Sequence, residues 1–348
     1  MASEYDARGN IYAIATPDEI RERGIPLPRD VVDAAFARHE WAPLAVEALC
    51  AWTPGARPAG AKSHRTDGLL VGPFQRSAPF DLLIVNTDGT LAERSGNGLT
   101  IFAQAQVDNH AVATNDQFAL RVHHDRFANP SPVVTLVEAD ELEGVRGFWL
   151  ELGTPSFGAA AVGASGTCLS ASGFRGHSLH RVEQLAALNQ KWEASQFVRI
   201  GNPHCVTLLE DARDLPGFVQ LQQSDLFKPL AKIAFSGPPG QGAGEPCADG
   251  VNLQWAVLDG EQRIVARIFE RGEGPTASSG TSASAVACAA WMTGLVTTGI
   301  VSVVMPGGIA PIRVVTREGE LQVSLFGSAS QLRGQNSLMS DCLRKDRS

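Results

Sequence analysis

The sequence has no run of apolar residues long enough to cross a lipid bilayer and no cluster of Lys and Arg residues. A membrane-spanning helix needs about 20 consecutive apolar residues, so we expect no membrane partner. A nucleic-acid-binding face needs concentrated positive charge, whereas this chain has a net charge of −8, so we expect no nucleic-acid partner either. The opening residues, MASEYDARGN, lack a basic stretch followed by an apolar core, and we expect no secretory signal.

The sequence also lacks paired cysteines and metal-binding motifs. Its six cysteines are scattered and form no CxxC pair, and 348 residues suffice to build a core without disulfides. We therefore expect a reduced, cytoplasmic protein whose cysteines are small core residues, Cys288 being the clearest case. His123 and His124 resemble an exposed strand end with no third ligand at a suitable spacing, and we expect no metal and no cofactor.

Most of the chain has the pattern of short β-strands. Runs rich in β-branched residues and bounded by Gly, Pro, Asp or Asn recur from FDLLIVNTDG to LQVSLFGSA. Two segments differ, because GLTIFAQAQV (98–107) and SASAVACAAWMTGLV (282–296) are apolar or small nearly all round, which is typical of buried helices. More ordinary helices are expected over 28–52 and 181–194. The Gly- and Pro-rich stretch 236–250 is predicted to be a surface loop or a lid over a site.

The two predicted buried helices begin alike. SGNG (95–98) opens the first and SGTS (279–282) opens the second, and a Gly-containing turn precedes each. Backbone N–H groups at such a helix start can bind an anion. The repetition suggests an internal duplication, with two halves that each wrap a sheet around a central helix.

Seven short motifs follow one another along the chain: ARGNIYAI, TDGLLVG, VNTDGTLAERSGNG, GNPHCV, DGVNLQWAV, ERGEGPTASSGTS and VMPGG. In this order they resemble the motifs of the diaminopimelate epimerase superfamily of cofactor-independent amino-acid epimerases, racemases and isomerases. The resemblance implies an α+β fold of two pseudo-symmetric halves, each a curved mixed sheet around a central buried helix, with the site in the cleft between them. The halves would span 1–144 plus 322–348 and 145–321, and a homodimer is possible because family members are often dimers.

The chain departs from the family pattern at the residues that react with the substrate. Family members use two cysteines that face each other across the α-carbon, one a thiolate base and the other a thiol acid. The matching positions are Ser95 and Ser279, and a serine hydroxyl can act as a base near neutral pH only if a neighbouring group activates it. Pro275 stands where the family usually has Glu, and Ser282 stands where it has Gly.

The family's substrate-recognition residues match polar residues of this chain. By resemblance, asparagines and a Glu-Arg pair hold the amino and carboxylate groups of the substrate, and the helix starts bind the carboxylate at the reacting carbon. His204 would order the site or serve as an alternative base. The matching substrate-binding positions are Asn10, Asn86, Gly96, Asn97, Asn202, Asn252, Glu270, Arg271, Gly280 and Thr281.

We therefore predict an isomerase that acts at the α-carbon of an amino acid or a related small carboxylic acid, with Ser95, Ser279 and His204 as catalytic candidates. One alternative is a lyase or double-bond isomerase of the same fold that acts on a more acidic substrate. Another is a non-catalytic homologue that binds amino acids. The two serines could also be simple helix caps, or replacements introduced into a cysteine enzyme.

Overall fold

The structure is a computed structural model that describes residues 3–113, 116–126, 130–166, 169–236 and 245–332. Cys168, Cys342 and residues 237–244 of the Gly- and Pro-rich stretch lie outside these ranges. The chain divides into two compact units, of which unit 1 contains residues 1–150 and 327–348 and unit 2 contains residues 151–326. The domain boundaries expected from the sequence stay a prediction.

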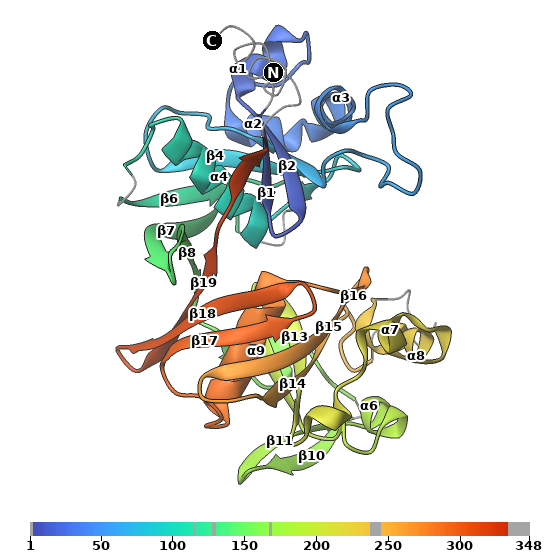
Figure 1. Ribbon diagram of the computed structural model, residues 1–348. Coiled ribbons are helices and arrows are strands. Elements are labelled where there is room, and N and C mark those ends of the chain that lie inside the picture. Colours follow the sequence, from blue (N-terminus) through green and yellow to red (C-terminus); the bar gives the residue numbers. More distant parts are fainter. Residues whose placement is uncertain (1–2, 114–115, 127–129, 167–168, 237–244, 333–348) are drawn as a thin grey trace, which may run out of the picture. The chain divides into compact units, whose positions relative to one another are not determined.

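Unit 1 combines a mixed sheet with helices on both of its faces (Figure 1). Its helices are α1 (Pro17–Glu22), α2 (Val31–Phe36), α3 (Arg38–Cys50) and α4 (Gly96–Asp108). Its strands are β1 (Ser3–Ala7), β2 (Asn10–Ala15), β3 (Gly68–Val71), β4 (Phe80–Asn86), β5 (Leu91–Ala92), β6 (Gln117–Val122), β7 (Val133–Leu142), β8 (Val145–Gly153) and β20 (Ser330–Leu332). The strand order is β20-β1-β2-β3-β4-β6-β7-β8, and β5 pairs with β4.

The central strands of unit 1 are buried on both faces. Along β4, Leu82 and Ile84 belong to the hydrophobic cluster that contains α4, whereas Leu83 and Val85 belong to the cluster formed with α1, α2 and α3. Successive side chains of a strand point to opposite faces, so a continuous apolar run serves both layers. The sheet therefore separates α4 from the other three helices.

Unit 2 has the same kind of layers around helix α9 (Gly280–Met292). Its other helices are α5 (Ala159–Val162), α6 (Glu183–Leu188), α7 (Phe218–Gln222), α8 (Ser224–Ala234) and the 3-10 helix Ala212–Asp214. Its strands are β9 (Ser156–Phe157), β10 (Leu169–Phe174), β11 (His177–Val182), β12 (Ser195–Ile200), β13 (Asn202–Leu209), β14 (Asn252–Leu258), β15 (Arg263–Glu270), β16 (Gly274–Thr276), β17 (Gly299–Met305), β18 (Gly308–Arg317) and β19 (Glu320–Gly327).

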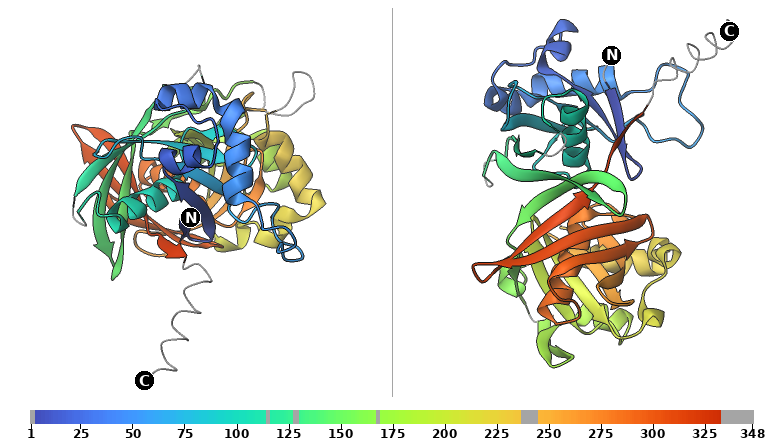
Figure 2. Two further views of the ribbon diagram at one scale, coloured as in Figure 1. Left: turned by 90° about the horizontal axis from the view of Figure 1, so that it is seen from above. Right: turned by 60° about the vertical axis from the view of Figure 1, so that its left-hand side comes forward.

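Helix α9 lies inside a curved sheet. It contacts β12, β13, β14, β15, β17 and β18, and Figures 1 and 2 show it enclosed by these strands. Its residues from Ser282 to Ala290 are buried, and nearly all of them are small. Small side chains allow strands to approach the helix from several sides, and alanine is also the best helix former. The prediction of a helix buried all round is confirmed.

The order of strands in unit 2 repeats that of unit 1. The series β1-β2-β3-β4-β5-α4-β6-β7-β8 corresponds to β12-β13-β14-β15-β16-α9-β17-β18-β19. Parallel pairs occur at the same two places, β2–β3 and β4–β6 in unit 1 and β13–β14 and β15–β17 in unit 2. The predicted α+β fold with two similar halves is therefore confirmed.

Candidate active site

The two candidate serines are the N-cap residues of α4 and α9. Both have extended backbones, with φ −142° and ψ 118° at Ser95 and φ −151° and ψ 122° at Ser279. Ser95 Oγ accepts a hydrogen bond from the Gly98 amide at 3.1 Å, and Ser279 Oγ accepts one from the Ser282 amide at 3.4 Å. Serine is a favoured cap residue, so these bonds alone explain why each helix begins where it does.

The leading residues of both helices are partly exposed. They are Gly96 and Asn97 in α4 and Gly280 and Thr281 in α9. The first amide groups of a helix have no carbonyl partner within the helix, and the helix dipole favours negative charge beside them. A Cβ atom at Gly280 would lie only 2.4 Å from a Cδ atom of Leu325, so this position accepts glycine alone without a shift. Both helix starts therefore present partly exposed positions at a helix end that favours negative charge.

In unit 1, a tyrosine that the sequence analysis did not select contacts Ser95. The Tyr12 hydroxyl lies 3.3 Å from Ser95 Oγ, and the Tyr12 side chain is buried. Gly68, on the neighbouring strand, leaves room for this ring, because a Cβ atom there would lie 2.7 Å from it. Tyr12 and Ser95 thus form a pair of weak acids at the start of α4.

Asn86 and Asn10 lie at strand ends of unit 1. Asn86 is the last residue of β4, and its Nδ2 donates to Thr90 Oγ1 at 2.9 Å. The Thr90 hydroxyl and amide in turn donate to Asp88 at 2.6 and 2.9 Å, which lowers the pKa of that carboxyl. Asn10 begins β2 and is partly exposed. Side-chain hydrogen bonds therefore fix the turn that leads from β4 toward α4.

In unit 2, the predicted residues Asn202, Asn252 and Arg271 come together. The Arg271 amide donates to Asn252 Oδ1 at 2.8 Å, and Asn252 is buried. The Arg271 guanidinium donates to Asn202 Oδ1 at 3.2 Å and to the Asp249 carbonyl at 3.1 Å. These contacts hold the guanidinium in one orientation, which prepares it to bind a carboxylate.

Glu270 stands beside Ser279 in the same unit. It is the last residue of β15, and the Ser282 hydroxyl donates to its carboxylate at 3.4 Å. Burial raises the pKa of Glu270, and the negative charge of Glu273 raises it further, while the two hydroxyls oppose the rise. A carboxylate with a raised pKa that contacts a serine hydroxyl can accept a proton from it.

His204 is completely buried behind this carboxylate. Its Nδ1 lies 3.1 Å from Gln254 Nε2, and the same nitrogen of Gln254 donates to Ser282 Oγ at 3.1 Å. Burial, with the positive charge of Arg271 as a second cause, lowers the pKa of His204 to about 3. The imidazole is therefore neutral at any physiological pH, which suits a role in ordering the site.

Nearby cysteines do not replace the serines as bases. Cys205 and Cys288 are both fully buried, as expected for core cysteines. Burial raises the pKa of Cys205 to about 12 and raises the pKa of Cys288 as well. Both thiols stay protonated at neutral pH, so neither supplies a thiolate.

Gly307, in the VMPGG motif, supports the loop before α9. Its amide donates to the Ala277 carbonyl at 2.7 Å. A Cβ atom at Gly307 would lie 2.9 Å from that carbonyl oxygen and 3.1 Å from the Cβ atom of Ser278. The motif therefore acts on the site by fixing the two residues that precede Ser279.

Replacing Gly307 by alanine is expected to lower the free energy of unfolding by about 1–3 kcal/mol, because the added methyl group presses on backbone that cannot move freely. Chemical denaturation would measure the change. Gly173→Ala is the matched control, since its Cβ would lie 4.0 Å from the nearest atom, a carbonyl oxygen. An equal loss in both variants would show that the contact with Ala277 is unimportant.

The two helix starts correspond residue by residue. From the strand pairings, Tyr12 corresponds to His204, Asn86 to Glu270, and Ser95 to Ser279. Sequence reasoning did not select Tyr12 and Gln254, which contact the candidate residues Ser95 and His204. A signal for Tyr12 was available, since it follows Asn10 by two positions, as His204 follows Asn202.

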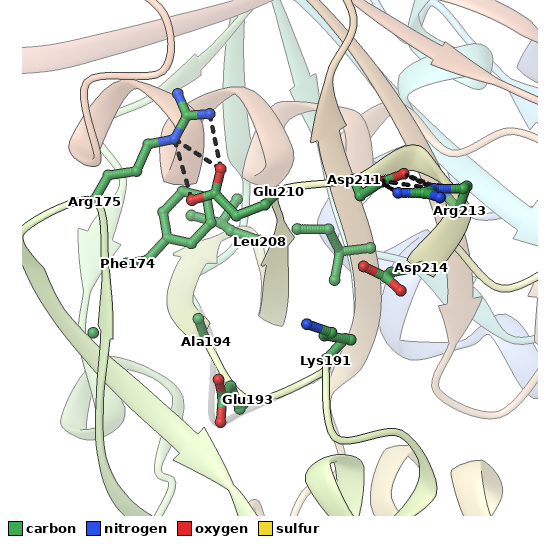
Figure 3. A pocket seen from close by; sticks show the side chains of 12 residues that line it. Phe174, Arg175, Lys191, Glu193, Ala194, Leu208, Glu210, Asp211, Arg213 and Asp214 are labelled. Atoms are coloured by element: carbon green, nitrogen blue, oxygen red, sulfur yellow. Dashed lines mark hydrogen bonds and ion pairs between the residues drawn. The ribbon is translucent and has the colours of Figure 1, made fainter.

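A surface hollow in unit 2 is separate from these residues. It has a volume of about 520 Å³ and lies at the other end of β13, beside Leu208 and Glu210 (Figure 3). Four of its charged side chains form two ion pairs, Arg175 with Glu210 and Arg213 with Asp211. None of the predicted site residues lines it.

One expectation about the histidines was wrong. His123 and His124 are buried, with exposures of 6% and 2%, and are not an exposed strand end. His123 Nε2 lies 2.7 Å from Asp81, and His124 Nε2 lies 3.0 Å from the Pro130 carbonyl.

Among the residues that the structure describes, no group of three or more His, Cys, Asp or Glu side chains could hold a metal ion. The same residues include no helix that is long and apolar enough to span a membrane.

Comparison with known proteins supports the resemblance. The sequence model of the family described as "Diaminopimelate epimerase" matches residues 196–332. The chain is 27% identical over 330 residues to "Diaminopimelate epimerase 2" of a Nostoc species, covering 94% of this chain and 92% of that one. It is 26% identical over 261 residues to the diaminopimelate epimerase of Cupriavidus necator, covering 75% of each chain.

Solved structures agree on the fold. A phenazine biosynthesis protein of the PhzF family from Bacillus anthracis superposes with a TM-score of 0.55 at 11% identity, over 95% of this chain and 96% of the other. A probable proline racemase from Agrobacterium radiobacter gives a TM-score of 0.52 at 12% identity, over 96% and 92% of the chains. The chain is therefore similar in sequence to diaminopimelate epimerases, and its fold is similar to that of these two solved structures.

Proposed function

We propose that the chain is a cofactor-independent isomerase that moves a proton at the α-carbon of an amino acid or a related small carboxylic acid. The relatives named as diaminopimelate epimerases and the epimerase-like fold support this class of reaction. Its partner would be a small molecule. The cytoplasmic location and the homodimer expected from the sequence stay predictions.

The observation that carries the proposal is the placement of Glu270 and Ser279 around Ser282, whose amide donates to Ser279 Oγ and whose hydroxyl donates to Glu270 Oε1. A serine hydroxyl needs a neighbouring base, and burial raises the pKa of the Glu270 carboxyl, while the Ser279 hydroxyl beside it favours its ionised form. In the proposed step the Cα–H bond breaks and its proton passes to Ser279 Oγ, while the hydroxyl proton of Ser279 passes to Glu270. The electron pair stays on the α-carbon, beside the substrate carboxylate.

Other predicted site residues would hold the substrate. Arg271, fixed by Asn202 and Asn252, would bind a carboxylate through its guanidinium. The partly exposed starts of α4 and α9 would stabilise the charge that develops on the carboxylate of the reacting carbon. Ser95, with the Tyr12 hydroxyl beside it, would return a proton in the second transfer.

A specific observation supports a second candidate function, that of a lyase or double-bond isomerase. Asn86 occupies in unit 1 the place that Glu270 occupies in unit 2, and the Ser95 hydroxyl contacts a tyrosine. A single carboxylate base with one weakly acidic partner suits reactions that abstract a single, more acidic proton. A homologue that binds amino acids without catalysis is the third possibility.

Proton NMR in D₂O would test these alternatives, with LL-diaminopimelate and a panel of small amino acids. Loss of the α-proton signal with inversion at the α-carbon supports the isomerase. Loss of the signal with an unsaturated product supports the lyase. Saturable binding without any exchange would leave only the binding protein and would refute the catalytic proposal.

The pH profile of exchange should follow the Glu270 carboxylate. Only the ionised form accepts a proton, and burial raises the pKa of Glu270, so the rate should fall as the pH drops through a value above the ordinary glutamate pKa of about 4.3. Exchange rates measured between pH 4 and pH 9 (about the stable range of most proteins) would locate this acid limb. A rate that stays level through this range contradicts the assignment of Glu270 as the base.

A further inference from the structure

A chain of side-chain hydrogen bonds runs from the core of unit 2 to Glu270. His204 Nδ1 accepts from Gln254 Nε2 at 3.1 Å, Gln254 Nε2 also donates to Ser282 Oγ at 3.1 Å, and Ser282 Oγ donates to Glu270 Oε1 at 3.4 Å. His204, Gln254 and Ser282 are each 0% exposed. The three residues come from β13, β14 and α9, so three elements of the fold converge on one carboxylate.

Unit 1 has no such chain at the corresponding positions. Leu70 corresponds to Gln254, and Gly98 corresponds to Ser282. A Cβ atom at Gly98 would lie 3.4 Å from Leu70, so these two positions are also neighbours in unit 1. In unit 1, the first of these positions has an apolar side chain and the second has none. The polar pair Gln254 and Ser282 therefore occurs in unit 2, where strand β15 ends at the carboxylate of Glu270.

One N–H group of Gln254 is directed to His204, and the other leads through Ser282 toward the carboxylate. A neutral imidazole with its proton on Nε2 offers Nδ1 as an acceptor, which orients the NH₂ group of Gln254 toward it. The second N–H of that group faces Ser282 Oγ, so the Ser282 hydroxyl directs its own proton to Glu270. The result is a carboxylate that accepts a hydrogen bond from Ser282, which favours the ionised form and opposes the rise of the pKa that burial causes.

The arrangement leaves two buried polar atoms without a partner. Within the part of the chain that the structure describes, Gln254 Oε1 accepts no hydrogen bond and His204 Nε2 has no hydrogen-bond partner. An unpaired buried acceptor destabilises a fold, so an apolar residue such as the leucine of unit 1 would pack here at lower cost. The amide is therefore better explained by what its NH₂ group does than by stability.

We propose that Gln254 and Ser282 are positioning residues, anchored on neutral His204, that hold the Glu270 carboxylate as a hydrogen-bond acceptor beside Ser279. The inference rests on the proposed function for its catalytic meaning. The hydrogen-bond chain itself can be tested without any catalysis.

Few other charged groups face Glu270. Glu273, on the turn that follows β15, is the one whose charge raises the Glu270 pKa. The adjacent strands β14, β16 and β17 carry no titratable residue. On α8, which packs against β15 through Phe227, the charged residues Asp225, Lys228 and Lys232 are exposed. The guanidinium of Arg271 contacts Asn202 and the Asp249 carbonyl, and His204 on β13 is neutral.

The test is a titration of the Glu270 carboxyl in the full chain. Protein labelled with glutamate carrying ¹³C in its side-chain carboxyl would be followed by NMR, and Glu270→Gln would assign the signal. Ser282→Ala is expected to raise the midpoint by about one pH unit, since it removes a donor to the ionised form. Gln254→Leu is expected to raise it less, and to add nothing in the Ser282→Ala background, because Gln254 acts through Ser282.

Ser284→Ala is the matched control. Ser284 is also 0% exposed on α9, but its hydroxyl donates to the Gly280 carbonyl at 2.8 Å. Ser282→Gly, which installs the residue found at Gly98, is a second variant if Ser282→Ala fails to fold. An unchanged midpoint in both Ser282 variants, or an equal rise in Ser284→Ala, would overturn the proposal. A raised midpoint without any deuterium exchange at substrate would uphold it and would remove the proposed function.

Discussion

Replacing Glu270 by glutamine is expected to lower the rate of α-proton exchange by about 10²–10⁴-fold, the range typical for loss of a general base. Glutamine has nearly the same shape and keeps an oxygen that can accept from Ser279 and Ser282, but it cannot take up a proton at neutral pH. The rate would be measured as deuterium incorporation by proton NMR at saturating substrate.

The same variant should be at least as stable as the original protein at neutral pH. The folded-state pKa of Glu270 is raised, so the folded state binds this proton more tightly than the unfolded chain does. Stability linked to the proton is present at low pH and is lost as the pH rises through the raised value. Glutamine cannot ionise, so the variant does not lose this stability as the pH rises. Thermal unfolding at pH 7 would measure the difference in stability. A loss of exchange in a protein that melts no earlier cannot be attributed to unfolding.

Glu273→Gln is the matched control, because Glu273 is an exposed carboxylate three residues away. It should leave the maximal rate unchanged and move the acid limb to lower pH, since its negative charge raises the Glu270 pKa. If Glu270→Gln retained full exchange, Glu270 would not be the base. Ser279 would then be only a helix cap.

The arrangement of the fold could be predicted from short stretches of sequence. The apolar and small-residue segments at 98–107 and 282–296 correspond to α4 and α9, and the stretch 28–52 contains α2 and α3. These segments have strong patterns that packing reinforces. Helix α8 was missed because Pro229 interrupts its pattern, and α6 ends at Leu188, well short of residue 194.

The site was less predictable, because it depends on contacts between distant strands. Asn202, Asn252 and Arg271 were selected from motifs, and the structure joins them by hydrogen bonds. Gln254 drew no attention, because a glutamine between two apolar residues is common in a strand. Its meaning appears only when β13 and β14 pair and place it beside His204. In the same way, Ser282 was noted only as a departure from a glycine.

Replacing both Ser95 and Ser279 by cysteine is expected to raise epimerisation of the substrate by about 10²-fold or more, since acid–base groups of matched pKa contribute on this scale. A thiol has a pKa of about 8.5, and a helix N-terminus lowers it further, whereas a serine hydroxyl ionises far above neutral pH. Chiral chromatography of the product and deuterium incorporation would measure inversion and exchange separately.

The single variants should separate the two proton transfers. Ser279→Cys places a thiol beside Glu270, whose negative charge opposes the effect of the helix start on the thiol pKa. It should raise exchange more than inversion, because inversion also requires a competent acid in unit 1. Ser95→Cys places the thiol beside the Tyr12 hydroxyl, and this variant alone should raise inversion little. Only the double variant should raise both.

Ser284→Cys controls for the mere addition of a thiol to α9, because Ser284 is buried one turn inside the helix. A gain in the double variant but not in this control would show that the helix starts retain the geometry of a two-cysteine epimerase and lack only its acidity. The absence of a gain, in a double variant that still binds the substrate, would show that the serines do not flank the reacting carbon. The Glu270 carboxylate would then have to act on the substrate directly, which favours a single-base lyase or double-bond isomerase over an epimerase.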